Sequence, residues 1–184
     1  MDLNFTKTMK LLNKVSSWKS FVVLLSLYIF FVVFVMSGMM NGGETQHQPL
    51  DLLFSYTPQQ AYDLITGYGE VRSRYALFSM SADTVYPIIY TSLFMILIMQ
   101  LCRGVWPHKM SFHRIALFPL FALFFDLCEN ICIITMIKIF PQQNDALATI
   151  SSLFTNLKWA SVAGIGIIIV VLAIWGLSKK LFTM

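Results

Sequence analysis

The chain has 184 residues and a formal net charge of +4, with 57% hydrophobic and only 12% charged side chains. Soluble domains carry about 25% charged residues, so this composition excludes an ordinary water-facing surface. It does not indicate nucleic-acid binding either, because most Lys and Arg side chains stand at the ends of apolar runs, where they orient membrane helices. We expect a single membrane domain, 1–184, since no polar block is long enough for a second core.

The first apolar run, 21–43, contains no charged residue and is long enough to cross a hydrocarbon core of about 30 Å. A cleaved signal peptide is the alternative interpretation. The charged leader before the run is long, however, and Val35-Met36-Ser37 is a poor match to a small-residue cleavage site. The pattern therefore favours a helix that is retained.

The segment 44–82 is the longest stretch outside the apolar runs. Thr57 followed by Pro58 is a typical helix start, with an N-cap residue before a proline. Apolar residues then fall on one helical face until glycines end the pattern. These are Ala61, Leu64, Ile65 and Tyr68, followed by Gly67 and Gly69. The sequence predicts a short amphipathic helix, either on the outer membrane surface or on the mouth of the bundle, and then an extension leading into the next span.

Three further apolar runs predict membrane helices at about 83–102, 115–140 and 152–178. Pro87 lies in the first turns of its run, where it removes few backbone hydrogen bonds, and Pro141 marks the end of the third span. The predicted fold is an all-α integral membrane protein. It is a bundle of four transmembrane helices with the short amphipathic helix in the outer loop between spans one and two.

The distribution of Lys and Arg predicts the orientation. Nine of the 13 cations precede span one, lie between spans two and three, or follow span four. The others are Arg72, Arg74, Lys138 and Lys158. The positive-inside rule then places both termini in the cytoplasm. We expect a multi-pass protein of the plasma (inner) membrane.

Polar side chains gather at overlapping depths in the outer half of three predicted spans. Each set shares a helical face: Asp83, Tyr86 and Tyr90; Asp126, Glu129 and Asn130; Thr155, Lys158 and Trp159. Ionisable groups inside a membrane are costly and almost always face protein or water. A bundle that turns these faces inward would bring Lys158 within reach of the acidic pair.

Lys158 can balance only one of the two carboxylates of Asp126 and Glu129, so a spare acidic group is expected. We also expect Arg72 and Arg74 to hang over the same opening. The first hypothesis is therefore a pocket, open to the outer face, that binds a small ligand, a lipid headgroup, an ion or a proton. It predicts that Glu129→Gln leaves folding nearly intact and abolishes binding.

Two other functions stay open on the sequence alone. In an assembly subunit, the polar residues only fix the helix register, and the small residues Ala160 and Gly164 form a close helix contact, within the bundle or between copies of the chain. In an intramembrane enzyme acting on a lipid, Asp126 and Glu129 would serve as acid and base.

Other motifs are weak. The three cysteines fall in or beside apolar runs, so no disulfide framework is predicted. His108 and His113 have the wrong spacing for one helical face and no acidic or Cys partner nearby, so we expect no metal site. Neither a nucleophile elbow nor a nucleotide-binding glycine loop is present, and no cofactor is expected.

Overall fold

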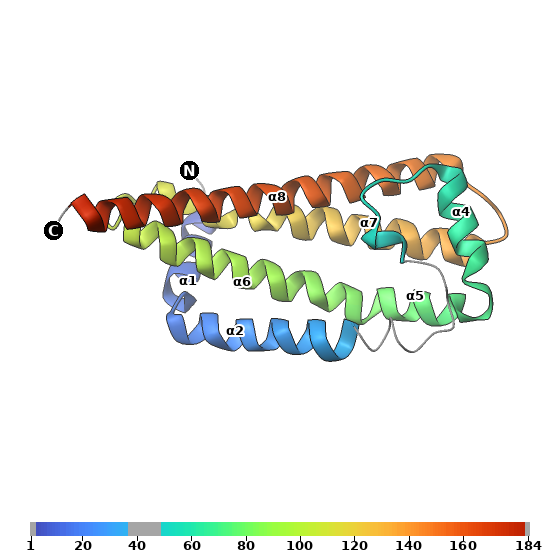
Figure 1. Cartoon of the computed structure of the whole chain (residues 1–184), viewed down its shortest axis with the longest axis horizontal. Helices are drawn as coiled ribbons and strands as arrows, with labels where there is room; N and C mark the ends of the chain where they lie inside the picture. The colour runs from blue at the N-terminus through green and yellow to red at the C-terminus, as the bar shows by residue number, and fades with distance from the viewer. Residues whose placement is uncertain (1–2, 37–48, 183–184) are drawn as a thin grey trace.

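The computed structural model of the chain describes residues 3–36 and 49–182, and within them every regular element is a helix (Figure 1). Four stretches are long and apolar enough to cross a membrane: Trp18–Val35, Arg72–Val105, Phe112–Ile139 and Asp145–Leu181. The predicted all-helical architecture with four such helices is thus confirmed.

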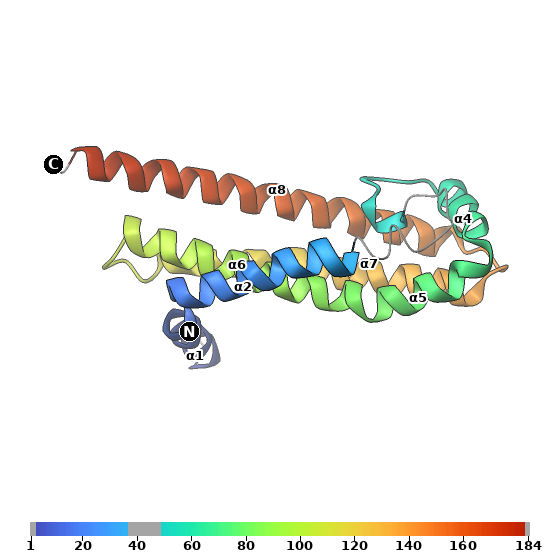
Figure 2. The same cartoon turned by 60° about the horizontal axis from the view of Figure 1, so that its bottom comes forward.

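The chain begins with α1 (Leu3–Val15) and α2 (Trp18–Phe30), which are separated by a sharp change of direction (Figure 2). Ser17 caps α2 by accepting a hydrogen bond from the backbone of Ser20. A π-helical segment, Phe31–Met36, continues α2. Helix α2 lies along α6, and none of the residues of α2 is buried. The later part of the predicted span 21–43 lies outside the described residues.

A 3-10 turn, Leu50–Leu52, precedes α4 (Pro58–Gly67). The start of α4 is a capping box, in which Thr57 and Gln60 each accept a hydrogen bond from the other's backbone. Its apolar face packs against α7 and α8. The predicted amphipathic helix is therefore present. Of the two positions predicted for it, the membrane surface and the mouth of the bundle, the structure has the second.

The next two helices, α5 (Arg72–Met80) and α6 (Ala82–Val105), are interrupted only at Ser81. The apolar helical stretch thus begins well before the predicted boundary at 83. After a 3-10 segment, Phe112–Leu117, α7 spans Pro119–Ile139. The last helix, α8 (Asp145–Phe182), also begins earlier than the predicted 152, because Asn144 accepts a hydrogen bond from the backbone of Leu147 and polar residues continue the helix.

Two apolar clusters hold the bundle together, one at each end (Figure 1). The cluster at the α4 end joins α4 and α5 to α7 and α8. The cluster at the opposite end joins α1 to α6, α7 and α8 through residues such as Met9, Ile98, Ala122 and Ile165. The buried ionisable residues Asp83, Asp126, Glu129 and Lys158 lie between these clusters along α6, α7 and α8.

The small-residue patch predicted on the last helix is divided between two environments. An added Cβ at Gly164 would lie 3.0 Å from the ring of Phe118, so this glycine permits a close approach within the bundle. Ala160 is exposed, and an added Cβ at Gly166 would meet nothing within 4 Å.

Candidate functional site

A buried ion pair joins α7 and α8, the two helices that pack against each other most extensively. Lys158 Nζ lies 2.6 Å from Glu129 Oε2, and Glu129 is fully buried. The other carboxylate oxygen of Glu129 accepts a hydrogen bond from Thr155 Oγ1 at 2.7 Å. Both oxygens of Glu129 are thus engaged by α8, which explains how the chain tolerates this carboxylate in an apolar interior.

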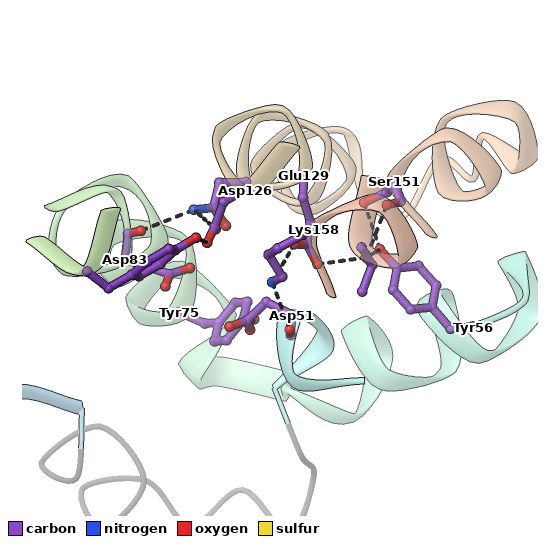
Figure 3. Close-up of polar contacts among 11 residues, drawn as sticks. Asp51, Tyr56, Tyr75, Asp83, Asp126, Glu129, Ser151 and Lys158 are labelled. Carbon is purple, nitrogen blue, oxygen red and sulfur yellow. Dashed lines mark hydrogen bonds and ion pairs between the residues drawn. The ribbon is translucent and has the colours of Figure 1, made fainter. Parts of the chain in front are cut away.

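The segment before α4 reaches the same ion pair. Lys158 Nζ donates to the backbone carbonyl of Asp51 at 3.1 Å, so the ammonium lies between Glu129 and Asp51 (Figure 3). The carboxylate of Asp51 accepts a hydrogen bond from the hydroxyl of Tyr75 at 2.7 Å. These contacts attach the 3-10 turn to α5 and α8.

Tyr56 extends the polar network toward α4. Its hydroxyl donates to Ser151 Oγ at 2.7 Å, and its backbone amide donates to Ser152 Oγ at 3.1 Å. Burial raises the pKa of Tyr56 to about 12, so the hydroxyl stays protonated at neutral pH and remains a donor.

Asp126 is held by two neighbours. It accepts hydrogen bonds from the hydroxyl of Tyr90 at 2.8 Å and from the side-chain amide of Asn130 at 3.5 Å. The Asn130 amide also donates to the backbone carbonyl of Asp83 at 3.2 Å. In a regular helix that carbonyl would accept from the amide of residue 87, but Pro87 has no N–H. Asn130 therefore supplies the donor that the proline removes.

The side chain of Asp83, unlike that of Asp126, is not held by its described neighbours. Only 6% of the residue is exposed, yet within the described part of the chain its carboxylate makes no ion pair and accepts no hydrogen bond. Buried carboxylates are normally paired or hydrogen-bonded. Asp83 is thus the one member of the predicted polar cluster whose charge the described residues leave without a direct partner.

A cavity of about 410 Å³ lies beside these residues. Its walls include the carboxylate-bearing residues Asp51, Asp83 and Asp126 and one cationic residue, Lys158. Aromatic and aliphatic side chains from α2, α5, α6 and α8 complete the lining, and Pro49 and Leu52 border it from the segment before α4. Small-molecule sites have volumes of about 300–1,000 Å³ and combine mostly apolar walls with a few polar groups, so this cavity has the size and character of one.

The structure brings together most of the residues predicted for the site. Five of them line the cavity: Asp83, Tyr86, Tyr90, Asp126 and Lys158. Glu129 and Asn130 lie directly behind it, bonded to Lys158 and Asp126 respectively.

The two predicted arginines do not line the cavity. Arg72 donates to the backbone carbonyl of Ile65, and its guanidinium stacks over the ring of Phe140 at 3.8 Å. Arg74 is exposed on α5. The expectation that both hang over the opening is therefore corrected: α5 is helical, and its spacing turns Tyr75 and Ser79 toward the cavity instead.

Sequence reasoning missed several residues that line the cavity, among them Tyr75 and Ser79 of α5 and Asp51 of the 3-10 turn. Tyr75 and Ser79 continue the face of Asp83, Tyr86 and Tyr90 at helical spacing, so extending the helix backward through 72–80 would have found them. Asp51 gave no such signal. It lies in the isolated 3-10 turn Leu50–Leu52 and reaches the site only through the fold.

No protein-family model matches this sequence, and no curated protein or solved structure is similar to it.

Proposed function

We propose that the chain is a multi-pass membrane protein that binds a small ligand in the cavity beside Asp83. The observation that carries the proposal is a ligand-sized cavity among apolar helices, with a nearly buried carboxylate on its wall that accepts no bond from the described residues. Burying a carboxylate without an ion pair or a hydrogen bond costs stability. A chain that keeps one on the wall of a cavity supports a role beyond stability.

The proposed orientation follows from the charges. The cations of α1, of the connection between α6 and α7, and of the end of α8 all lie at the end opposite α4 (Figure 1). The positive-inside rule makes that end cytoplasmic. The cavity, bordered by the segment before α4, would then open toward the outer face of a plasma membrane.

The enzyme hypothesis has less support. Its proposed acid and base, Asp126 and Glu129, both have their carboxylate oxygens bonded by neighbours in the chain. The assembly hypothesis predicted a contact through Ala160 and Gly164, and Gly164 already faces Phe118 of its own chain.

A cavity-filling substitution tests the proposal. Val162 lines the cavity, so Val162→Phe places a ring in it, whereas Val170→Phe adds the same ring at an exposed position of the same helix. The purified protein in mild detergent would be unfolded thermally with a panel of inorganic cations, amines, phosphoethanolamine, neutral alcohols and carboxylates. A ligand present at about 100 times its Kd stabilises by about 2.7 kcal/mol.

We expect at least one compound to raise the Tm of the wild type and of Val170→Phe but not of Val162→Phe. If no compound stabilises the wild type more than it stabilises Val162→Phe, the cavity is not a binding site.

A further inference from the structure

The cavity has a strong imbalance of charge. Three of its lining residues, Asp51, Asp83 and Asp126, carry carboxylates, and the cation among the described lining residues, Lys158, is already bonded to Glu129 and to the Asp51 carbonyl. An anionic ligand would meet like charges with no cation released to bind it. A zwitterionic headgroup would meet the same repulsion through its phosphate.

The three carboxylates differ in whether the described residues already donate hydrogen bonds to them. Asp126 accepts from Tyr90 and Asn130, and Asp51 accepts from Tyr75. The carboxylate of Asp83 accepts no hydrogen bond from the described residues and the residue is 94% buried, so its carboxylate oxygens remain for a donor in the cavity. In Figure 3, Asp83 lies on the α6 side of the site, with Tyr75 below it and Asp51 beyond Tyr75.

The walls of the cavity are rich in aromatic rings. Its lining includes Tyr28, Tyr75, Tyr86, Tyr90, Phe94 and Trp159. The ring of Tyr86 stacks on Tyr28 with centroids 5.8 Å apart and meets Tyr90 edge-on at 5.3 Å. The faces of aromatic rings attract organic cations through cation–π interactions, and the rings bind apolar groups by burial.

A metal ion fits this lining less well. Among the described residues, no group of three His, Cys, Asp or Glu side chains is arranged to hold one. Hard cations such as Ca²⁺ take six to eight oxygen ligands, roughly, whereas most of this lining is aromatic or aliphatic.

We propose that the ligand is an organic cation, an ammonium group on a compact apolar body without an anionic group, held by the Asp83 carboxylate with its body among the tyrosines. This assignment rests on the proposed function of the cavity. The same chemistry has two sources, a free amine from solution and a single-chain amine lipid from the membrane.

The test uses three probes of similar shape: 2-phenylethylamine, which is cationic at pH 7, 2-phenylethanol, which is neutral, and 3-phenylpropanoate, which is anionic. Binding to the full chain in lipid nanodiscs would be measured by calorimetry. The variant is Asp83→Asn, and the matched control is Asp63→Asn, which removes an exposed carboxylate from α4.

We expect the amine to bind the wild type and Asp63→Asn, and its Kd to rise about 30-fold or more in Asp83→Asn, because a buried charge loses its counter-ion. The alcohol and the carboxylate should bind at least tenfold more weakly than the amine. This ratio corresponds to roughly the free energy of one hydrogen bond to a charged group. This comparison needs only the wild type, so it decides the assignment even if Asp83→Asn does not fold.

Other results separate the two proposals. If the alcohol binds as tightly as the amine, the cavity binds ligands but the cation assignment is wrong. If no probe binds and the cavity-filling screen is also negative, both proposals fail. Sphingosine added to the nanodiscs distinguishes the sources: displacement of the phenylethylamine by sphingosine identifies the membrane as a source, and no displacement identifies the solution.

Discussion

Two acidic side chains in this molecule have opposite environments. Glu129 is bonded through both carboxylate oxygens, to Lys158 and to Thr155, whereas the carboxylate of Asp83 faces a cavity and accepts no hydrogen bond from the described residues. A buried, fully bonded carboxylate holds helices together, and a buried, unbonded one is kept at a cost in stability. The residue that carries the proposed ligand contact is therefore Asp83, and the structural one is Glu129.

This assignment reverses one prediction from the sequence. Glu129→Gln was expected to leave folding nearly intact, but it would leave the ammonium of Lys158 buried with no opposite charge bonded to it. We now expect the variant to lose about 3–5 kcal/mol of unfolding free energy. The joint replacement Glu129→Leu with Lys158→Met removes both charges and should lose much less. Chemical denaturation in one detergent measures both variants, and equal losses would show that the pair does not act as a unit.

Some of the site could be predicted residue by residue. The depths of Lys158 and Glu129, counted along two predicted helices, place them within reach of each other, and the structure has them 2.6 Å apart. The role of Asp51 could not be predicted in this way. Its backbone carbonyl, and not its side chain, is bonded to Lys158, and the position of an isolated 3-10 turn is set by tertiary packing.

Pro87 gives α6 an unusual requirement for a hydrogen-bond donor. It leaves the carbonyl of Asp83 without its helical donor, and Asn130 of α7 replaces that donor. We expect Asn130→Leu to destabilise by about 1–3 kcal/mol, the cost of a buried group left unbonded. Adding Pro87→Ala restores a backbone N–H and should recover part of the loss. A double-mutant cycle by thermal unfolding measures the coupling, and strictly additive effects would contradict it.

The contact between α8 and the start of α7 depends on a missing side chain. A Cβ at Gly164 would lie 3.0 Å from the Phe118 ring, whereas at Gly166 it would meet nothing within 4 Å. Gly164→Ala should therefore lower the Tm, while Gly166→Ala should keep or raise it, since alanine favours a helix by about 1 kcal/mol over glycine. A Gly164→Ala protein as stable as the wild type would show that Phe118 moves aside freely.

Helix positions were more predictable than helix ends. Apolar runs long enough to cross a membrane gave all four helices. The ends were missed where polar residues extend the helix, as in α8, whose first residues lie at 145–151 and belong to a helix through their capping and tertiary contacts. Hydropathy indicates whether a segment lies in lipid or in water, whereas capping residues determine where its helix begins and ends.

At the scale of the whole molecule, the ends of the bundle differ in charge and in packing. One end has α4 and the α7–α8 connection; the other has α1 and the basic end of α8 (Figures 1 and 2). A basic end faces the cytoplasm under the positive-inside rule. The proposed cavity lies nearer the α4 end, since the segment before α4 borders it.

Cysteine labelling in intact cells tests this orientation. In a background without the native cysteines, Gln142→Cys lies in the exposed connection between α7 and α8, and Lys180→Cys lies at the exposed end of α8. We expect an impermeant maleimide to label position 142 directly and position 180 only after the membrane is permeabilised. The reverse labelling pattern would show that the molecule has the opposite orientation, with the cavity open to the cytoplasm.

We propose that Asp83 is kept for a ligand and not for the fold. Equilibrium unfolding of the wild type, Asp83→Asn and Glu129→Gln in one detergent at pH 7, without ligand, tests it most directly. We expect Asp83→Asn to match or exceed the stability of the wild type, because it removes a buried charge that the described residues do not bond, while Glu129→Gln falls by about 3–5 kcal/mol. A comparable fall in both variants would mean that Asp83 holds the bundle together, and the account of the cavity would be contradicted.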